Sequence, residues 1–229
     1  MSRPFVSCTR GLGLVLGVVC RVVLGAVVIA GLAACSRGDA RANIGGPAVP
    51  LPAPFARPSF TLTATDGRPF DFAQRTHGKL TFLLFGYTHC PDVCPVHVAN
   101  ISAAMKSLTF EERARTTLVF ITTDPMRDSL SVLRSWLATF DSSFVGLTGS
   151  VDDVARLAVS LQVAPAMFGA PNADKSYEVG HGAQVIVWQP DDTARFIFPF
   201  GVRQKEWAEA MPRLIGRAPT LMQRITGKS

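Results

Sequence analysis

The feature that most constrains this chain is a short apolar run followed closely by two cysteines. Residues 82–85 are Phe, Leu, Leu and Phe, and Gly86 ends the run. Four large apolar residues in succession are typical of a strand that is covered on both faces. Cys90 and Cys94 follow, and each has a proline directly after it. The pattern therefore predicts a buried strand that leads into a dithiol.

The residues after the dithiol predict a helix. One apolar stripe recurs there at helical spacing and extends back to the cysteines: Val98, Ile101, Met105 and Leu108. We therefore expect both thiols at or just before a helix N-terminus, where the helix dipole favours thiolate. A pair of thiols at i and i+4 can close a disulfide or hold one soft metal ion, such as Cu(I) or Zn(II). The alternative, two cysteines that are buried only for packing, does not explain the two prolines.

Composition limits the other classes of function. The chain has 229 residues, of which 48% are hydrophobic and 17% charged, as expected for one domain with appendages. The net charge is +6, but no run of basic residues interleaved with aromatics occurs, so nucleic-acid binding has little support. Of the five cysteines, only Cys90 and Cys94 lie in the body of the chain. This is not the disulfide framework of a small secreted fold.

Residues 1–35 are typical of an export signal. Arg3, Arg10 and Arg21 precede a purely apolar segment that ends in Leu-Ala-Ala-Cys35, which resembles a bacterial lipobox. This resemblance implies lipidation of Cys35 and a membrane-anchored domain in the periplasm, or otherwise outside the cytoplasmic membrane. The alternative is an uncleaved transmembrane anchor, which would bury Arg21 at a cost of about 2.5–3.5 kcal/mol.

The rest of the chain divides into three parts. Residues 36–57, rich in Pro, Gly and Ala, predict a linker. Residues 58–216 predict the domain, and residues 217–229 a C-terminal tail.

Within the domain we expect a hairpin over 60–70, strands over 117–122 and 144–147, helices after Asp128, over 151–161 and over 205–215, and a second hairpin over 183–198. This alternation predicts an α/β sheet with helices on both faces. The dithiol would lie beyond the carboxyl end of a strand, where open α/β sheets place their sites.

The segment from Gly86 to Pro95 resembles the CxxxCP signature of the Sco/SenC family, whose members are membrane-anchored, thioredoxin-like copper proteins that help assemble the CuA site of cytochrome c oxidase. The segment Asp124-Pro125-Met126-Arg127-Asp128 resembles the family's DPxRD pattern. The resemblance covers about residues 58–216. It implies a thioredoxin-like fold with an N-terminal β-hairpin extension and a β-hairpin near the C-terminus.

The residues of the second motif have simpler interpretations as well. Pro125 breaks the preceding strand, and Asp128 is placed to cap the next helix. Asp124 and Arg127 could in addition shape the loop beside a metal ion.

The resemblance also implies a copper site formed by Cys90, Cys94 and His181, with one copper ion, Cu(I) or Cu(II), per chain. Sco proteins usually have Asp before this histidine, whereas Gly180 stands here. His97 is the local rival, because it lies three residues after Cys94, but its position also suits a partly exposed side chain in the first helical turn.

The two remaining histidines have weaker claims. His89 adjoins Cys90 and could orient or tune the site. His77 lies in a polar segment, and we expect a solvated loop residue.

Two functions from different classes follow. The first is a metallochaperone, not an enzyme, that delivers copper to the CuA-bearing subunit of cytochrome c oxidase or to another copper partner. The second is thiol–disulfide exchange, in which Cys90 and Cys94 form a redox-active pair that closes a disulfide; redox signalling would use the same residues. Only the copper function requires His181.

Overall fold

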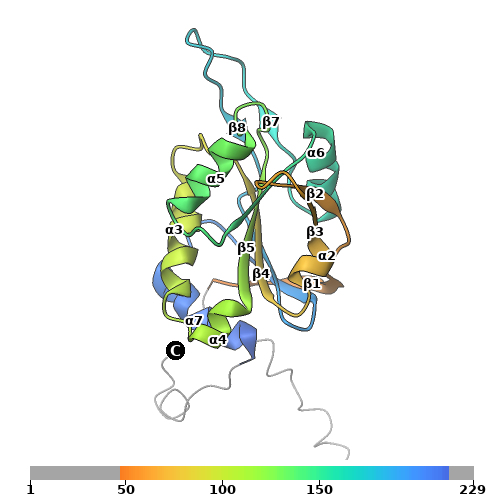
Figure 1. Ribbon diagram of the computed structural model, residues 1–229, viewed down its shortest axis with the longest axis vertical. Coiled ribbons are helices and arrows are strands. Elements are labelled where there is room, and N and C mark those ends of the chain that lie inside the picture. The colour runs from red at the N-terminus through yellow and green to blue at the C-terminus, as the bar shows by residue number, and fades with distance from the viewer. Residues whose placement is uncertain (1–46, 217–229) are drawn as a thin grey trace, which may run out of the picture. The chain divides into compact units, whose positions relative to one another are not determined.

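The computed structural model describes residues 47–216, which form an eight-stranded sheet in the order β1-β10-β9-β4-β5-β6-β2-β3 (Figure 1). The centre of the sheet is parallel: β4 (Leu80–Gly86) pairs with β5 (Thr116–Thr122), which pairs with β6 (Val145–Thr148). All seven residues of β4 are buried, which confirms the predicted buried strand. Side chains alternate between the two faces of a strand, so β4 contributes to the core on both sides of the sheet.

Antiparallel hairpins extend this parallel centre at both sides, as the sequence predicts. The first hairpin, β2 (Thr61–Ala64) and β3 (Pro69–Asp71), attaches to β6. The second, β9 (Val185–Trp188) and β10 (Thr193–Phe198), attaches to β4 through β9.

The predicted linker is in part a strand, so its boundary was wrong. β1 (Val49–Ala56) pairs with β10 at the edge of the sheet, although it contains Pro50, Pro52 and Pro54. Proline lacks a backbone N–H and is therefore tolerated on an edge strand, where one side makes no ladder hydrogen bonds. The pairing is interrupted by a register shift between Pro50 and Phe55. Because of these prolines, the composition of the segment predicts a linker and not a strand.

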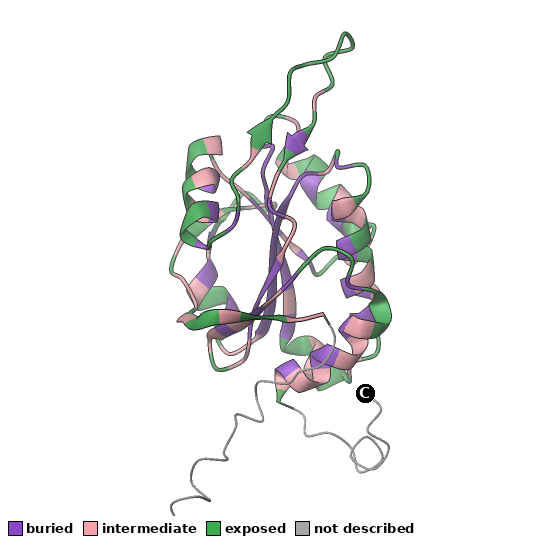
Figure 2. Cartoon of the chain, turned by 180° about the vertical axis from the view of Figure 1, so that it is seen from behind, coloured by how far each residue is buried: buried purple, intermediate pink, exposed green. Residues whose placement is uncertain are grey.

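Helices cover both faces of the sheet, as the alternation of strands and helices predicts (Figure 1). One face packs against α3 (Val93–Met105), α5 (Leu130–Ala138) and α7 (Gln204–Ile215). The other packs against α2 (Phe72–Thr76) and α6 (Val151–Ser160). A further short helix, α4 (Phe110–Ala114), precedes β5. The buried residues lie along the central strands and on the inner sides of the helices (Figure 2).

A two-stranded hairpin, β7 (Met167–Phe168) with β8 (Val179–Gly180), stands apart from the main sheet. The loop between its strands projects from one end of the domain (Figure 1). The sequence predicts no element between the helix over 151–161 and the hairpin over 183–198, because strands of two residues leave no periodicity to detect.

The predicted signal, the lipidation of Cys35 and the tail over 217–229 lie outside the described residues. Within residues 47–216, no helix is both long enough and apolar enough to cross a membrane.

Candidate dithiol and metal site

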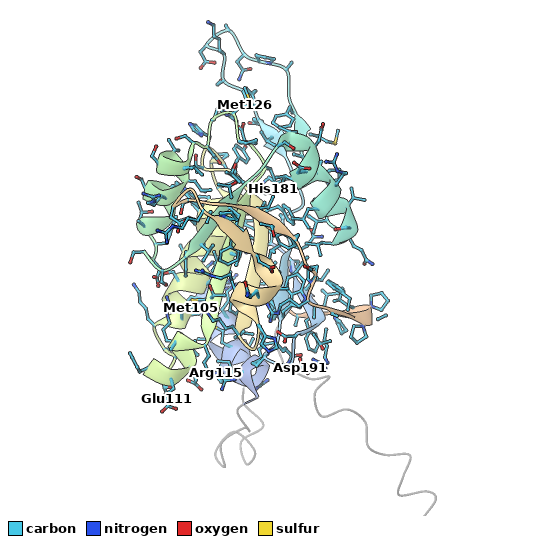
Figure 3. The ribbon with its side chains drawn as sticks, turned by 45° about the vertical axis from the view of Figure 1, so that its right-hand side comes forward. Met105, Glu111, Arg115, Met126, His181 and Asp191 are labelled. Atoms are coloured by element: carbon cyan, nitrogen blue, oxygen red, sulfur yellow. The ribbon has the colours of Figure 1, made fainter. Side chains whose placement is uncertain are left out.

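The topology of the sheet brings the predicted site residues to one edge. Cys90 follows the carboxyl end of β4, and Cys94 lies in the first turn of α3. His181 precedes β9, which runs antiparallel to β4, so β9 begins at the edge where β4 ends. His181 lies toward the end of the domain that carries Met126, opposite Glu111 and Arg115 (Figure 3). Two segments about 90 residues apart therefore meet because of strand direction.

The helix begins just after the first cysteine. α3 starts at Val93, and the side chain of Asp92 caps it by accepting from the Val93 N–H. The Sγ of Cys90 accepts a hydrogen bond from the Cys94 backbone N–H at 3.4 Å, so this sulfur receives one of the N–H groups that a helix start leaves unpaired. Cys90 is 8% exposed and Cys94 is 1% exposed. The prediction of two thiols at a helix N-terminus is confirmed.

His181 presents one ring nitrogen to the dithiol. Its Nδ1 lies 3.0 Å from the Gly182 carbonyl oxygen. A carbonyl only accepts, so Nδ1 carries the proton and Nε2 holds the free lone pair. Nε2 lies 3.4 Å from the Cys94 Sγ. A backbone carbonyl that fixes the tautomer of a histidine in this way is the usual partner of a metal-binding imidazole.

The three predicted donors form one compact group. The Sγ atoms of Cys90 and Cys94 and a ring nitrogen of His181 all lie within 4.8 Å of one another. Two thiolates and an imidazole suit soft or borderline ions, Cu(I) and Zn(II), and do not suit Mg²⁺ or Ca²⁺. A structural zinc normally has four protein ligands, so this donor set fits copper better than structural zinc.

The two thiols have very different acidities. The hydrogen bond from the Cys94 side chain is the largest effect on Cys90. It outweighs burial and, with the Cys94 and Asp92 backbone, lowers the pKa of Cys90 to about 5. The same hydrogen bond, together with burial, raises the pKa of Cys94. At neutral pH, Cys94 is therefore protonated and donates to the Cys90 thiolate, which is the nucleophile of the pair. Both cysteines are free, so the Cys90–Cys94 disulfide stays a prediction.

We expect iodoacetamide to alkylate Cys90 before Cys94, because only the thiolate reacts and Cys94 is both protonated and buried. The rate should be constant above about pH 6 and fall as the pH decreases through the Cys90 pKa of about 5. Peptide mass spectrometry of the reduced protein after short exposures at several pH values measures both rates. A midpoint near 8.5, the pKa of an unperturbed cysteine, would contradict the arrangement described here.

Contacts lead from the site through Tyr87 to Arg127, and from there to Tyr177 and Asp124. Tyr87 packs edge-on against His181, with ring centroids 5.8 Å apart. Arg127 lies over the Tyr177 ring at 3.7 Å and near the Tyr87 ring at 5.6 Å. Asp124 is fully buried, pairs with Arg127 and accepts from the Tyr177 hydroxyl at 2.9 Å. Asp124 and Arg127 thus reach the site through aromatic rings, and their influence on a metal ion stays a prediction.

Asp128 does not cap the next helix, contrary to the sequence prediction. Ser129 caps α5, and Asp128 is 1% exposed. Its carboxylate accepts from the Thr88 N–H at 2.9 Å, from the Thr88 hydroxyl at 2.5 Å and from the Thr122 hydroxyl at 2.6 Å. It therefore fixes the segment that leads from β4 to Cys90. Adjacent Ser and Asp both suit a cap, and only the packing distinguishes them.

We expect Asp128→Ala to lower the free energy of unfolding by about 2–4 kcal/mol, because buried donors would lose their charged acceptor. Asp153→Ala is the matched control: Asp153 is an exposed aspartate near the start of α6, and its loss should cost about 1 kcal/mol or less. Urea unfolding of both variants measures the difference. Equal losses would show that the Asp128 carboxylate contributes no more than a surface group.

The other histidines fall outside the three-donor group. His97 is 2% exposed, so the expectation of a partly exposed side chain was wrong; it packs against Phe200, with ring centroids 5.3 Å apart. The side chain of His89 is half exposed, and its Nδ1 lies 3.1 Å from the Thr88 hydroxyl. His77 is largely exposed, as predicted, and pairs with Asp192.

Sequence reasoning missed the residues that only position the site. Tyr87 and Tyr177 carry no motif signal of their own, although Tyr87 lies inside the CxxxCP segment. Gly86, which ends the apolar run, and Gly182, which follows His181, are both places where a side chain does not fit. A Cβ at Gly86 would lie 2.5 Å from the Cys94 Sγ, and one at Gly182 would lie 2.4 Å from the Val163 Cγ1.

The fold and the site define a thioredoxin-like domain with a buried dithiol and a histidine that converge on one point. The chain belongs to the SCO1/SenC family, whose pattern matches residues 50–216. It is 30% identical to Protein SCO2 of Saccharomyces cerevisiae mitochondria over 145 residues, which are 62% of this chain and 46% of the yeast protein. It is also 30% identical to the mitochondrial Protein SCO1 homolog 1 of Arabidopsis thaliana, over 66% of this chain and 41% of that protein. The match thus spans about half the length of these relatives or less.

Solved structures of other proteins support the same family and fold. The copper-bound structure of Bradyrhizobium japonicum ScoI is 30% identical, with a TM-score of 0.60, and covers 70% of this chain and 99% of its own. The copper-bound structure of Arabidopsis thaliana ScoI is 26% identical, with a TM-score of 0.64, and covers 72% of this chain and 100% of its own. The predicted thioredoxin-like fold is confirmed.

Proposed function

We propose that this chain binds one copper ion through Cys90, Cys94 and His181 and delivers it to the CuA site of a cytochrome c oxidase. The convergence of the three donor atoms within 4.8 Å of one another carries the proposal. Two relatives at 26–30% identity with the same fold hold copper in their solved structures. The chemistry of the donor set and the membership of the family therefore support the same metal.

The arrangement suits a cargo ion that must be released. Cys90 and His181 keep some exposure, whereas Cys94 is buried. Three donors leave Cu(I) room to accept a ligand from a partner before any donor of this chain dissociates. An acceptor with its own pair of cysteines can then take the ion by stepwise ligand exchange. We propose that the domain works outside the cytoplasmic membrane, tethered through a lipid on Cys35.

Thiol–disulfide exchange is a second candidate, and the lowered pKa of Cys90 favours it. The Cys90 thiolate can attack a disulfide sulfur of a substrate protein and form a mixed disulfide, which Cys94 then resolves. The products are a Cys90–Cys94 disulfide and a reduced dithiol on the substrate. This reaction needs no histidine, so it does not explain why the His181 Nε2 faces the dithiol.

Copper titration of the full chain tests the proposed function. The reduced protein is titrated with Cu(I) under anaerobic conditions against a chromophoric chelator, beside Cys90→Ser and Cys94→Ser. We expect one ion per chain in the wild type and a large loss of affinity in both variants. A wild type that does not compete with the chelator would overturn the copper function and leave thiol exchange as the better assignment.

A further inference from the structure

His97 is a buried imidazole that the three-donor site does not use. It is 2% exposed, and within the described residues neither ring nitrogen makes a hydrogen bond of good geometry, although the Ala183 backbone lies near enough to interact with the ring. Buried polar groups are nearly always paired, and an exception commonly marks a place for an ion or a water molecule. The side chain therefore needs an explanation that packing alone does not give.

His97 lies on the helix that carries Cys94, and its ring interacts with His181. It is three residues after Cys94 on α3, and residues at this spacing share a helix face. Burial lowers the pKa of His97; hydrogen bonding with the Ala183 backbone opposes this effect, and the neighbouring His181 adds to it. His97 is thus neutral at neutral pH, and a neutral imidazole has a lone pair for a metal ion.

We propose that His97 is a fourth ligand that joins the site when the bound ion is Cu(II). This inference rests on the proposed copper function. Cys90, Cys94 and His181 suffice for Cu(I), whereas Cu(II) prefers four ligands in a tetragonal arrangement. With His97 the donors become two sulfurs and two imidazole nitrogens.

The residue before His181 and the buried carboxylates near the site do not provide the fourth donor. Gly180, directly before His181, has no side chain. The carboxylate of Asp124 is engaged by Arg127 and Tyr177, and that of Asp128 by Thr88 and Thr122. Within the described part of the chain, His97 is a buried donor near the site whose ring nitrogens have no side-chain partner.

Binding requires a movement of the ring. His97 does not belong to the group whose donor atoms lie within 4.8 Å of one another, so its nitrogen must approach the ion. The ring against it, Phe200, is 48% exposed and follows the last strand, so it can yield without opening the core. The need to move gives a two-state site: three ligands for Cu(I) and four for Cu(II).

Pulsed electron paramagnetic resonance of the full chain loaded with one equivalent of Cu(II) tests the inference, since it counts coordinated imidazoles. We expect two in the wild type, one in His97→Gln and one in His181→Ala. His77→Gln is the matched control, because His77 is exposed and paired with Asp192, and it should keep two. Competition titrations should show Cu(I) affinity within about twofold of the wild type in His97→Gln and Cu(II) affinity lower by about 10–100-fold.

One imidazole in the wild type would overturn the inference, whether or not His97→Gln folds. Equal losses of Cu(I) and Cu(II) affinity in His97→Gln would overturn it as well, because a residue that only supports the fold affects both ions alike. A wild type that binds Cu(I) but has one imidazole as Cu(II) refutes the role of His97 and leaves the proposed function intact. A wild type that binds neither ion refutes both.

Discussion

His181→Ala is expected to lower the Cu(I) affinity of the reduced chain by at least about 100-fold, the upper end of the loss seen when even an indirect partner of a metal ligand is removed. The substitution takes away the one nitrogen donor of the three-donor group, the Nε2 that lies 3.4 Å from the Cys94 Sγ. Two thiolates remain, and they hold Cu(I) in a weaker two-coordinate arrangement. Anaerobic competition with a chromophoric chelator measures the change.

The matched control is His77→Ala, which removes a histidine that pairs with Asp192 and touches none of the three donors. Its Cu(I) affinity should equal that of the wild type. The rate of Cys90 alkylation in apo His181→Ala is a second readout. It should stay close to that of the wild type, because the largest cause of the low pKa of Cys90 is Cys94 and not His181. If His181→Ala bound copper with wild-type affinity, the assignment of His181 as a ligand would be wrong, and another histidine would have to supply the nitrogen donor.

Gly86→Ala is expected to destabilise the fold by about 1–3 kcal/mol and to weaken copper binding as well. Gly86 is the last residue of β4, and a Cβ there would lie 2.5 Å from the Cys94 Sγ and 2.8 Å from the Phe120 Cζ. Cys94 and Phe120 are both buried, so neither can move aside without disturbing the core. Displacement of the Cys94 sulfur then separates it from Cys90 and His181.

Gly180→Ala is the matched control for this prediction. A Cβ at Gly180 would lie 3.8 Å from its nearest neighbour, the Met167 carbonyl oxygen, which is an ordinary contact. The stability of this variant should stay within about 0.5 kcal/mol of the wild type. Denaturant unfolding of the apo forms and Cu(I) competition measure both effects. A Gly86→Ala variant as stable as Gly180→Ala would show that the strand end adapts to a methyl group.

Local patterns in the sequence predicted most elements of the sheet and the nature of the site. The run over 82–85 gave the central strand, the stripe after Cys94 gave α3, and the two hairpins followed from alternation and turn residues. These features depend on neighbours in the chain. The selection of His181 depended on the resemblance to Sco proteins, because nothing around His181 in the sequence connects it with Cys94.

The errors came from residues whose partners are distant in sequence. The prolines of β1 predicted a linker, because the strand forms only by pairing with β10. The sequence predicted a helix cap at Asp128, because two of its hydrogen bonds come from Thr88, which lies 40 residues earlier in the chain. The sequence predicted a partly exposed side chain for His97, because Phe200, which packs against it, lies far along the chain, after the last strand of the sheet.

The sequence by itself determined that this chain has a dithiol at the junction of a buried strand and a helix, since both elements are specified within one short segment. Only the tertiary structure decided which histidine faces that dithiol and which cysteine is the more acidic. The direction of β9 relative to β4 places His181 at the site. The hydrogen bonds and the burial around Cys90 and Cys94 separate their pKa values. Such effects act through space, and no local pattern of residues encodes them.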